Sequence, residues 1–143
     1  MSGKSVLLVD DERDFIDALS SRLERRGFKM SVAYDGPSAI ELVGKSTFDA
    51  VILDLVMPGM SGIETLERIL EIDPDLQVVL LTAHGTVKAG VDALKTGASD
   101  FLQKPADLEE LLEKIQEAAA KKMILVEKRT AEEIADILRR KGW

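Results

Sequence analysis

The sequence predicts an α/β fold in which a five-stranded parallel sheet carries helices on both faces. Two observations predict it. Short runs of β-branched residues alternate with segments of helical periodicity along the chain, which is the pattern of parallel sheets covered by helices. The 143 residues, 45% apolar and 31% charged, suit a single globular domain with a substantial core.

Five apolar runs are the predicted strands, and a helical segment follows each of them. The strands lie near residues 5–9, 29–34, 49–53, 77–82 and 99–102. The helices are predicted at 13–26, from Pro37, at 63–72, at 87–94 and from Asp107.

Turn and stop residues mark the limits of the predicted helices. The first helix carries one apolar stripe and stops at Gly27, a residue suited to the position after a helix. The second begins at Pro37, which is comfortable in a first helical turn. Asp-Pro-Asp at 73–75 halts the third helix, and the fourth stops near Gly97. The apolar face of the fifth helix holds Leu108, Leu111, Leu112 and Ile115.

The predicted strands fit a flavodoxin-like doubly wound sheet with the strand order 2-1-3-4-5. In that order strands 1 and 3 flank the point where the winding reverses, and ligands bind there at the carboxyl ends of the strands. Strand 1 ends at Asp10 and Asp11, and strand 3 ends at Asp54. Thr82 and Lys104 end the next two strands. The topology therefore predicts three carboxylates, one hydroxyl and one ammonium on a single rim.

Three carboxylates on one rim predict a site for a divalent cation. Two carboxylates about 5 Å apart repel by roughly 3 kcal/mol at an effective dielectric of about 20, so a bound cation would relieve the repulsion. An oxygen-only site without His or Cys suits Mg²⁺ or Mn²⁺ better than Zn²⁺. The alternative is that Asp10 and Asp11 only cap the next helix.

Asp54 is the predicted reactive residue. It ends an apolar strand and enters a loop of turn-forming residues at 55–62. A carboxylate mounted there can attack phosphorus and form an acyl phosphate. Phosphoryl transfer depends on positioning and charge neutralisation, to which the Thr82 hydroxyl and the Lys104 ammonium would contribute.

Four short motifs at the strand ends carry a family resemblance. They are Val-Asp-Asp-Glu at 9–12, Asp54 four residues before Pro58, Leu-Thr-Ala at 81–83 and Lys-Pro at 104–105. In this order they resemble the receiver (chemotaxis-regulator-like) domain of two-component response regulators, stand-alone or excised. The resemblance covers residues 4 to about 120.

The resemblance implies a phosphoacceptor site. Asp54 would accept a phosphoryl group from the histidine of a sensor kinase or from a phosphotransfer protein. Asp11, Asp54 and the backbone carbonyl of Val56 would bind Mg²⁺ (or Mn²⁺), with Asp10 acting mainly through water. Lys104 would pair with the phosphoryl oxygens.

The resemblance also implies a switch. Thr82 would move to hydrogen-bond the phosphoryl group, and Phe101 would follow into the vacated space, although Phe101 is equally well a core aromatic. The surface of the fourth helix, fifth strand and fifth helix would change in response. Val56 offers no polar group to orient an attacking water, which predicts a long-lived phosphoryl state. His84 is expected to be an ordinary loop residue.

Two other functions are open alternatives. A haloacid-dehalogenase-like phosphohydrolase also uses a strand-end Asp, but it needs a second acid two residues on, where this chain has Val56. A pseudo-receiver that binds partners without phosphorylation would be expected to lack Asp54, Thr82 or Lys104. We therefore expect a signalling phosphoacceptor with only self-phosphorylation and self-dephosphorylation chemistry, and not an enzyme.

The last residues are predicted to form a separate unit. Residues 1–122 would form the receiver domain, and 123–143 a C-terminal helical extension. Thr-Ala-Glu-Glu at 130–133 has the composition of a capping box, which predicts a new amphipathic helix from Thr130. We expect this helix to pack back on its own domain, with a dimer contact or a docking peptide as the alternative.

Composition restricts the partners and the location. A net charge of −7 argues against direct binding of nucleic acid. The absence of cysteine excludes disulfides and thiolate metal sites, and no apolar stretch reaches membrane-spanning length. The first residues lead directly into a strand and leave no room for a signal peptide. We expect a cytoplasmic monomer or phosphorylation-dependent dimer that binds a kinase or phosphotransfer protein and an unknown downstream protein, and no membrane.

Overall fold

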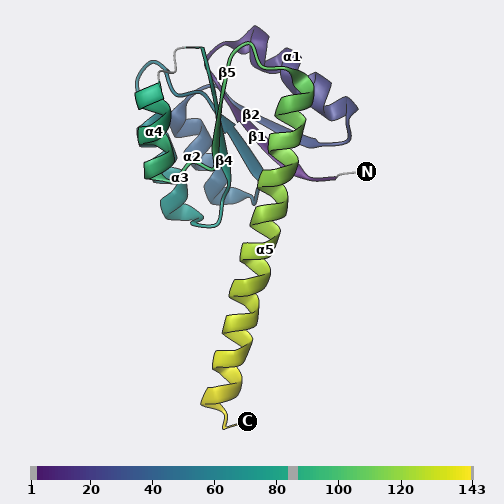
Figure 1. The fold of residues 1–143 in the computed structure, drawn as a ribbon, viewed down its shortest axis with the longest axis vertical. Helices are drawn as coiled ribbons and strands as arrows, with labels where there is room; N and C mark the ends of the chain where they lie inside the picture. Colours follow the sequence, from purple (N-terminus) through teal and green to yellow (C-terminus); the bar gives the residue numbers. More distant parts are fainter. Residues whose placement is uncertain (1–2, 84–86, 143) are drawn as a thin grey trace.

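In a computed structural model, five strands and five helices alternate along the residues that the structure describes, 3–83 and 87–142 (Figure 1). The elements in chain order are β1 Ser5–Val9, α1 Arg13–Arg25, β2 Lys29–Ala33, α2 Gly36–Lys45, β3 Ala50–Leu53, α3 Gly62–Ile72, β4 Val78–Thr82, α4 Val87–Thr96, β5 Asp100–Gln103 and α5 Leu108–Arg140. The five predicted strands and the five helices predicted to follow them are therefore confirmed, with boundaries shifted by a few residues.

All neighbouring strands are parallel, and their order is β2-β1-β3-β4-β5, which confirms the predicted fold class. The register aligns the carboxyl ends of the inner strands, because Val9 pairs with Leu53 and Leu53 pairs with Leu80. Thr82 pairs with Gln103 at the end of the β4–β5 ladder. The residues that follow these strand ends consequently lie along one rim.

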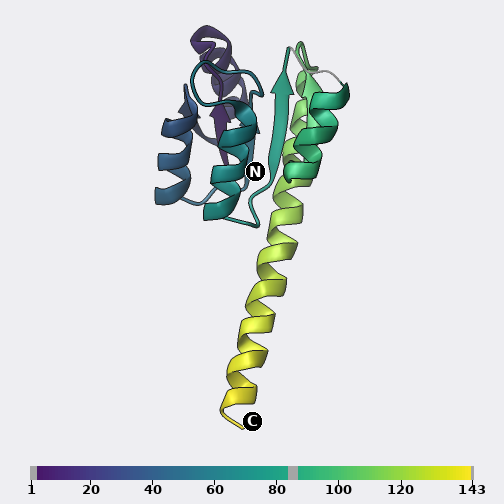
Figure 2. The same ribbon diagram turned by 90° about the vertical axis from the view of Figure 1, so that its left-hand side faces the viewer.

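The sheet has an apolar core on each face. Successive residues of a strand point to opposite faces, so the buried strands contribute to both cores. The first core lies under α2, α3 and α4 and includes Leu7, Leu53, Val43, Leu66, Ile69 and Ala93. The second lies under α1 and α5 and includes Leu8, Ile52, Ile16, Leu23, Leu111 and Ile115. Figure 2 shows α2 and α3 (blue and teal) on the left of the central strand and α5 (green to yellow) on its right.

Two side chains fix the starts of helices near the rim. The Asp35 carboxylate accepts a hydrogen bond from the Ser38 N–H (2.8 Å) at the start of α2. The Ser61 hydroxyl accepts one from the Glu64 N–H (3.2 Å) at the start of α3. These caps satisfy helix N–H groups that have no partner within the helix.

The last helix corrects one prediction. α5 is a continuous helix of 33 residues, about 50 Å long at 1.5 Å per residue, so the predicted new start at Thr130 is wrong. The residues around Thr130 include no Gly or Pro and several good helix formers, which lets the preceding helix run through them. The proposed domain boundary between residues 122 and 123 falls inside this helix.

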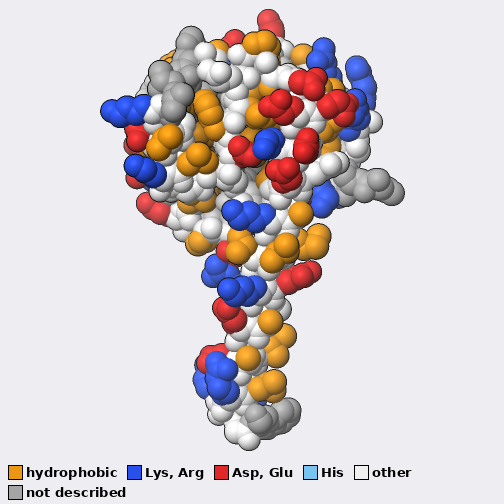
Figure 3. Space-filling view, in the orientation of Figure 1, with side chains coloured by type: hydrophobic (Ala, Val, Ile, Leu, Met, Phe, Trp, Pro, Cys, Tyr) orange, Lys and Arg blue, Asp and Glu red, His pale blue; other side chains and the backbone are white. Residues whose placement is uncertain are grey.

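The expectation that the final segment packs back on its domain is also wrong. Figures 1 and 2 show α5 projecting well beyond the sheet. Its apolar side chains there are exposed: Met123, Ile124, Val126, Ile134, Ile137 and Leu138. At about 100° per residue they spread over nearly half a turn, from about 50° (Val126) to about 210° (Ile124) round the helix from the stripe of Leu111, Ile115 and Ala118 that packs on the domain. Figure 3 shows hydrophobic side chains along one flank of the projection.

Two basic residues attach the base of the projection to the turn between α3 and β4. Lys122 is buried, and its ammonium donates to the Phe48 carbonyl and to the Asp73 carboxylate (2.9 Å). About two turns further on, the Arg129 guanidinium makes two hydrogen bonds to Asp75, of 2.9 and 2.8 Å. A planar guanidinium bound to both carboxylate oxygens fixes geometry as well as charge. Of the helices in the described ranges, none is long and apolar enough to cross a membrane.

Replacing the buried Lys122 tests this attachment. Lys122→Met should lower the free energy of unfolding by about 1–3 kcal/mol, because the Phe48 carbonyl and the Asp73 carboxylate lose a buried donor. Urea unfolding followed by circular dichroism measures the change. Lys121→Met removes the same charge from an exposed neighbour and should change stability by less than about 0.5 kcal/mol. Equal effects of the two substitutions would contradict a structural role for the Lys122 ammonium.

Candidate functional site

Asp54 is held rigidly where β3 ends. Its N–H donates to the Val9 carbonyl (2.9 Å), and its carboxylate accepts from the Val56 N–H (3.3 Å). The side chain is only 6% exposed. The loop that follows returns to its own start, because the Gly62 N–H donates to the Leu55 carbonyl (3.0 Å). A Cβ on Gly62 would lie 2.5 Å from the Leu55 backbone, so this close approach requires glycine.

Asp10 lies beside Asp54 where β1 ends. Its N–H donates to the Ala33 carbonyl (3.1 Å), which continues the ladder with β2. Its two carboxylate oxygens accept from the Glu12 N–H (3.0 Å) and from the Lys104 ammonium (2.6 Å). The residue is 4% exposed. Asp10 is therefore a fully engaged part of the rim and not a surface helix cap.

Lys104 follows β5 and brings a positive charge to the rim. Its Nζ lies 2.6 Å from Asp10, 2.9 Å from Glu12 and 4.0 Å from Asp54. The ammonium also lies over the Phe15 ring, 4.4 Å from its centroid. Burial lowers the pKa of Lys104, but the hydrogen bonds to Asp10 and Glu12 and the nearby carboxylate charges outweigh burial and raise the pKa above its ordinary value. Lys104 is therefore positively charged at neutral pH.

Three carboxylates converge next to this ammonium. Oxygens of Asp10, Glu12 and Asp54 lie within 4.8 Å of one another, a set that suits a hard divalent cation. The sequence predicted the meeting of Asp10 and Asp54 but missed Glu12. The chain bends at residue 11, and the Glu12 N–H donates to the Asp10 carboxylate (3.0 Å), which keeps residues 10 and 12 close together. Asp11 between them is exposed and is not part of the cluster.

Attraction and repulsion between charges oppose each other at Asp54. Two carboxylates 4.8 Å apart repel by about 3.5 kcal/mol at a dielectric of about 20, and Lys104 attracts Asp54 at 4.0 Å by about 4 kcal/mol. Glu12 is partly exposed, which weakens its share. Among the described residues, three carboxylates and one ammonium meet here, so the cluster carries a net negative charge. The site favours the arrival of further positive charge.

The remaining predicted site residues occupy the same rim or the neighbouring β5 strand. Thr82 ends β4 beside Gln103, the residue before Lys104; its side chain is not described. The Val56 side chain is exposed. Phe101 is half-buried in β5 and packs against the first core. A Cβ on Gly90 of α4 would come within 3.2 Å of the Phe101 ring. His84 lies outside the described residues.

Comparison with known proteins shows which family the domain resembles. The response regulator receiver domain family matches residues 6–116. The transcriptional regulatory protein DctD for C4-dicarboxylate transport of Rhizobium meliloti is 35% identical over 92% of this chain and 29% of its own length. The transcriptional regulatory protein ZraR of Klebsiella oxytoca is 39% identical over 84% of this chain and 28% of its own length. The chain thus spans less than a third of these relatives.

Solved structures give the same result. A CheY-like response regulator receiver domain from Methanospirillum hungatei superposes with a TM-score of 0.81 at 27% identity, covering 85% of this chain and 98% of that one. A response regulator from Burkholderia pseudomallei, solved with a phosphorylated aspartic acid, a calcium ion and citrate, gives a TM-score of 0.76 at 28% identity. That match covers 97% of this chain and 86% of the other.

Removing one charge of the cluster tests the electrostatic balance. Asp54→Asn should raise the free energy of unfolding in EDTA by about 1 kcal/mol, since it relieves repulsion from Asp10 and Glu12 at the cost of a weaker pairing with Lys104. Asp14→Asn, an exposed charge removal in the first turn of α1, should have an effect below about 0.5 kcal/mol. Urea unfolding measures both, and a destabilised Asp54→Asn variant would refute the balance.

Proposed function

The chain belongs to the response regulator receiver domain family, and on that premise we propose that Asp54 is its phosphoacceptor. The observation that carries the proposal is a carboxylate held at a strand end, 6% exposed, beside one ammonium and two further carboxylates. The phosphorylated aspartate in the Burkholderia pseudomallei regulator supports this assignment by similarity.

The proposed reaction transfers a phosphoryl group from nitrogen to oxygen. A carboxylate oxygen of Asp54 attacks the phosphorus of a phosphohistidine, the P–N bond breaks, and the histidine nitrogen leaves with its electron pair and takes up a proton. The product on Asp54 is an acyl phosphate. Lys104 supplies positive charge toward the phosphoryl oxygens, and the rigid backbone around Asp54 supplies the orientation.

We propose Mg²⁺ as the cation of this site, with Mn²⁺ as a substitute. Receiver domains bind a divalent metal through acidic side chains, and the oxygen-only cluster here fits one. Asp10 and Asp54 of the cluster would hold it together with two groups outside the cluster, the exposed Asp11 and the backbone carbonyl of Val56, with Asp10 acting mainly through water. When bound, the cation neutralises charge on the phosphoryl oxygens.

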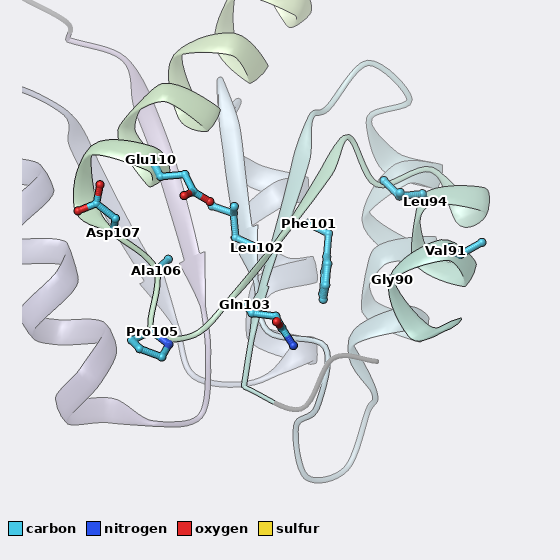
Figure 4. A pocket seen from close by; sticks show the side chains of 10 residues that line it. All are labelled: Gly90, Val91, Leu94, Phe101, Leu102, Gln103, Pro105, Ala106, Asp107 and Glu110. Atoms are coloured by element: carbon cyan, nitrogen blue, oxygen red, sulfur yellow. The ribbon is translucent and has the colours of Figure 1, made fainter. Parts of the chain in front are cut away.

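The phosphoryl group would act on the protein surface next to the rim. Thr82 stands at the rim, and Phe101 lies two residues before Gln103 on the neighbouring strand. Figure 4 shows Phe101, Gly90 and Leu94 around a surface groove of about 570 Å³ between α4, β5 and the start of α5. We propose that Thr82 and Phe101 couple phosphorylation to this groove, where an unidentified downstream protein would bind.

The proposed partners follow from the transfer reaction. A sensor histidine kinase or a phosphotransfer protein would donate the phosphoryl group. Because such kinases take phosphate from ATP, we propose that the domain acts in the cytoplasm, as a monomer or a phosphorylation-dependent dimer. No direct contact with nucleic acid or membrane is proposed, and its only chemistry would be its own phosphorylation and dephosphorylation.

Mass spectrometry after incubation with acetyl phosphate tests the proposal. The wild type in Mg²⁺ should gain the mass of one phosphoryl group, whereas Asp54→Asn and the wild type in EDTA should not, because they lack the nucleophile and the cation. Asp14→Asn, which loses an exposed charge next to the rim, should be phosphorylated like the wild type. A phosphorylated Asp54→Asn variant, or steady hydrolysis of added phosphate esters, would contradict a signalling phosphoacceptor.

A further inference from the structure

The Lys104 ammonium lies closer to two other acids than to Asp54, the proposed phosphoacceptor. Its Nζ is 2.6 Å from Asp10 and 2.9 Å from Glu12, but 4.0 Å from Asp54. An ammonium has three N–H donors, and two of them are used by Asp10 and Glu12. Asp10 and Glu12 would therefore compete with a phosphoryl group on Asp54 for this ammonium.

The two acids that hold Lys104 differ in their freedom to release it. Asp10 is buried, and its other oxygen accepts from the Glu12 N–H (3.0 Å), so its position is fixed. The Glu12 side chain is 61% exposed. Glu12 also stands at the N-cap of α1, yet its side chain makes no capping hydrogen bond. Its carboxylate instead accepts a hydrogen bond from Lys104, which is 92 residues away in sequence.

From this arrangement, and resting on the proposed function, we propose that Glu12 is a positioning residue that holds Lys104 in the unphosphorylated protein. Glu12 draws the ammonium away from Asp54 and offsets part of its charge. An incoming phosphoryl group, with up to two negative charges, competes with Glu12 for the same ammonium. Glu12 thereby slows phosphorylation, because its carboxylate stays paired with the Lys104 ammonium while Asp54 is unmodified.

Competition for Lys104 can be told from other roles of Glu12 by the direction in which its replacement changes the phosphorylation rate. A residue needed only for folding would reduce phosphorylation when replaced, and a residue that bound the metal would do the same. A competitor for Lys104 increases it. The expected size is that of one exposed ion pair, an increase of up to about fivefold.

The test measures the rate constant for phosphorylation of the full chain by acetyl phosphate in saturating Mg²⁺. Glu12→Gln should raise it, by up to about fivefold. Glu12→Asp keeps the charge but shortens the side chain by one methylene, so contact with Lys104 is lost and the rate constant should rise as well. Asp14→Asn removes an exposed charge from the same end of α1 and should leave it unchanged.

Each result decides between the proposals. An unchanged or lower rate constant for Glu12→Gln overturns the role of Glu12 while leaving Asp54 as phosphoacceptor. Equal increases for Glu12→Gln and Asp14→Asn, with no increase for Glu12→Asp, overturn it in favour of a general charge effect. A wild type that is not phosphorylated at all overturns the proposed function and the role of Glu12 with it.

Discussion

The pairing of Lys104 with the acids of the rim is the interaction on which the site depends. Folding brings three carboxylates within 4.8 Å of one another, and the Lys104 ammonium is the cation bound among them. Asp10 and Asp54 are almost fully buried, so water screens their repulsion poorly. A sheet that ends in so many acids is compatible with a stable fold because β5 delivers a lysine to the same place.

The topology explains why these groups meet. Asp10, Asp54 and Lys104 come from three strand ends that are far apart in sequence, and the parallel register aligns those ends. α5 then starts beside the rim and runs back along the sheet, so its projection leaves from the opposite edge, as Figure 1 shows. The Lys122 and Arg129 contacts attach it there. α5 thus runs from the rim that holds the candidate site to the projection on the far side of the domain.

Much of this could be predicted from the sequence, because the informative signals are local and periodic. Alternating runs predicted the parallel sheet, the doubly wound topology that it fits predicted the strand order, and the polar residue after each run identified Asp10, Asp54, Thr82 and Lys104 as neighbours. Glu12 was missed because its contact with Lys104 is a tertiary one. The predicted start at Thr130 failed because a capping-box composition is equally acceptable inside a helix whose neighbours favour helix. The predicted packing of the final segment on its own domain was wrong, because an apolar stripe in a sequence identifies a hydrophobic helix face but does not identify what that face contacts.

The central claim is that the Asp54 carboxylate stores a phosphoryl group as an acyl phosphate. Borohydride reduces an acyl phosphate to an alcohol and so converts the modified aspartate to homoserine, which peptide sequencing by mass spectrometry can locate. After treatment of the wild type with a small phosphodonor and Mg²⁺, followed by borohydride, homoserine is expected at position 54 alone. Homoserine at position 10 or 11, or unmodified aspartate at 54 in a protein that has gained phosphate, would contradict the claim.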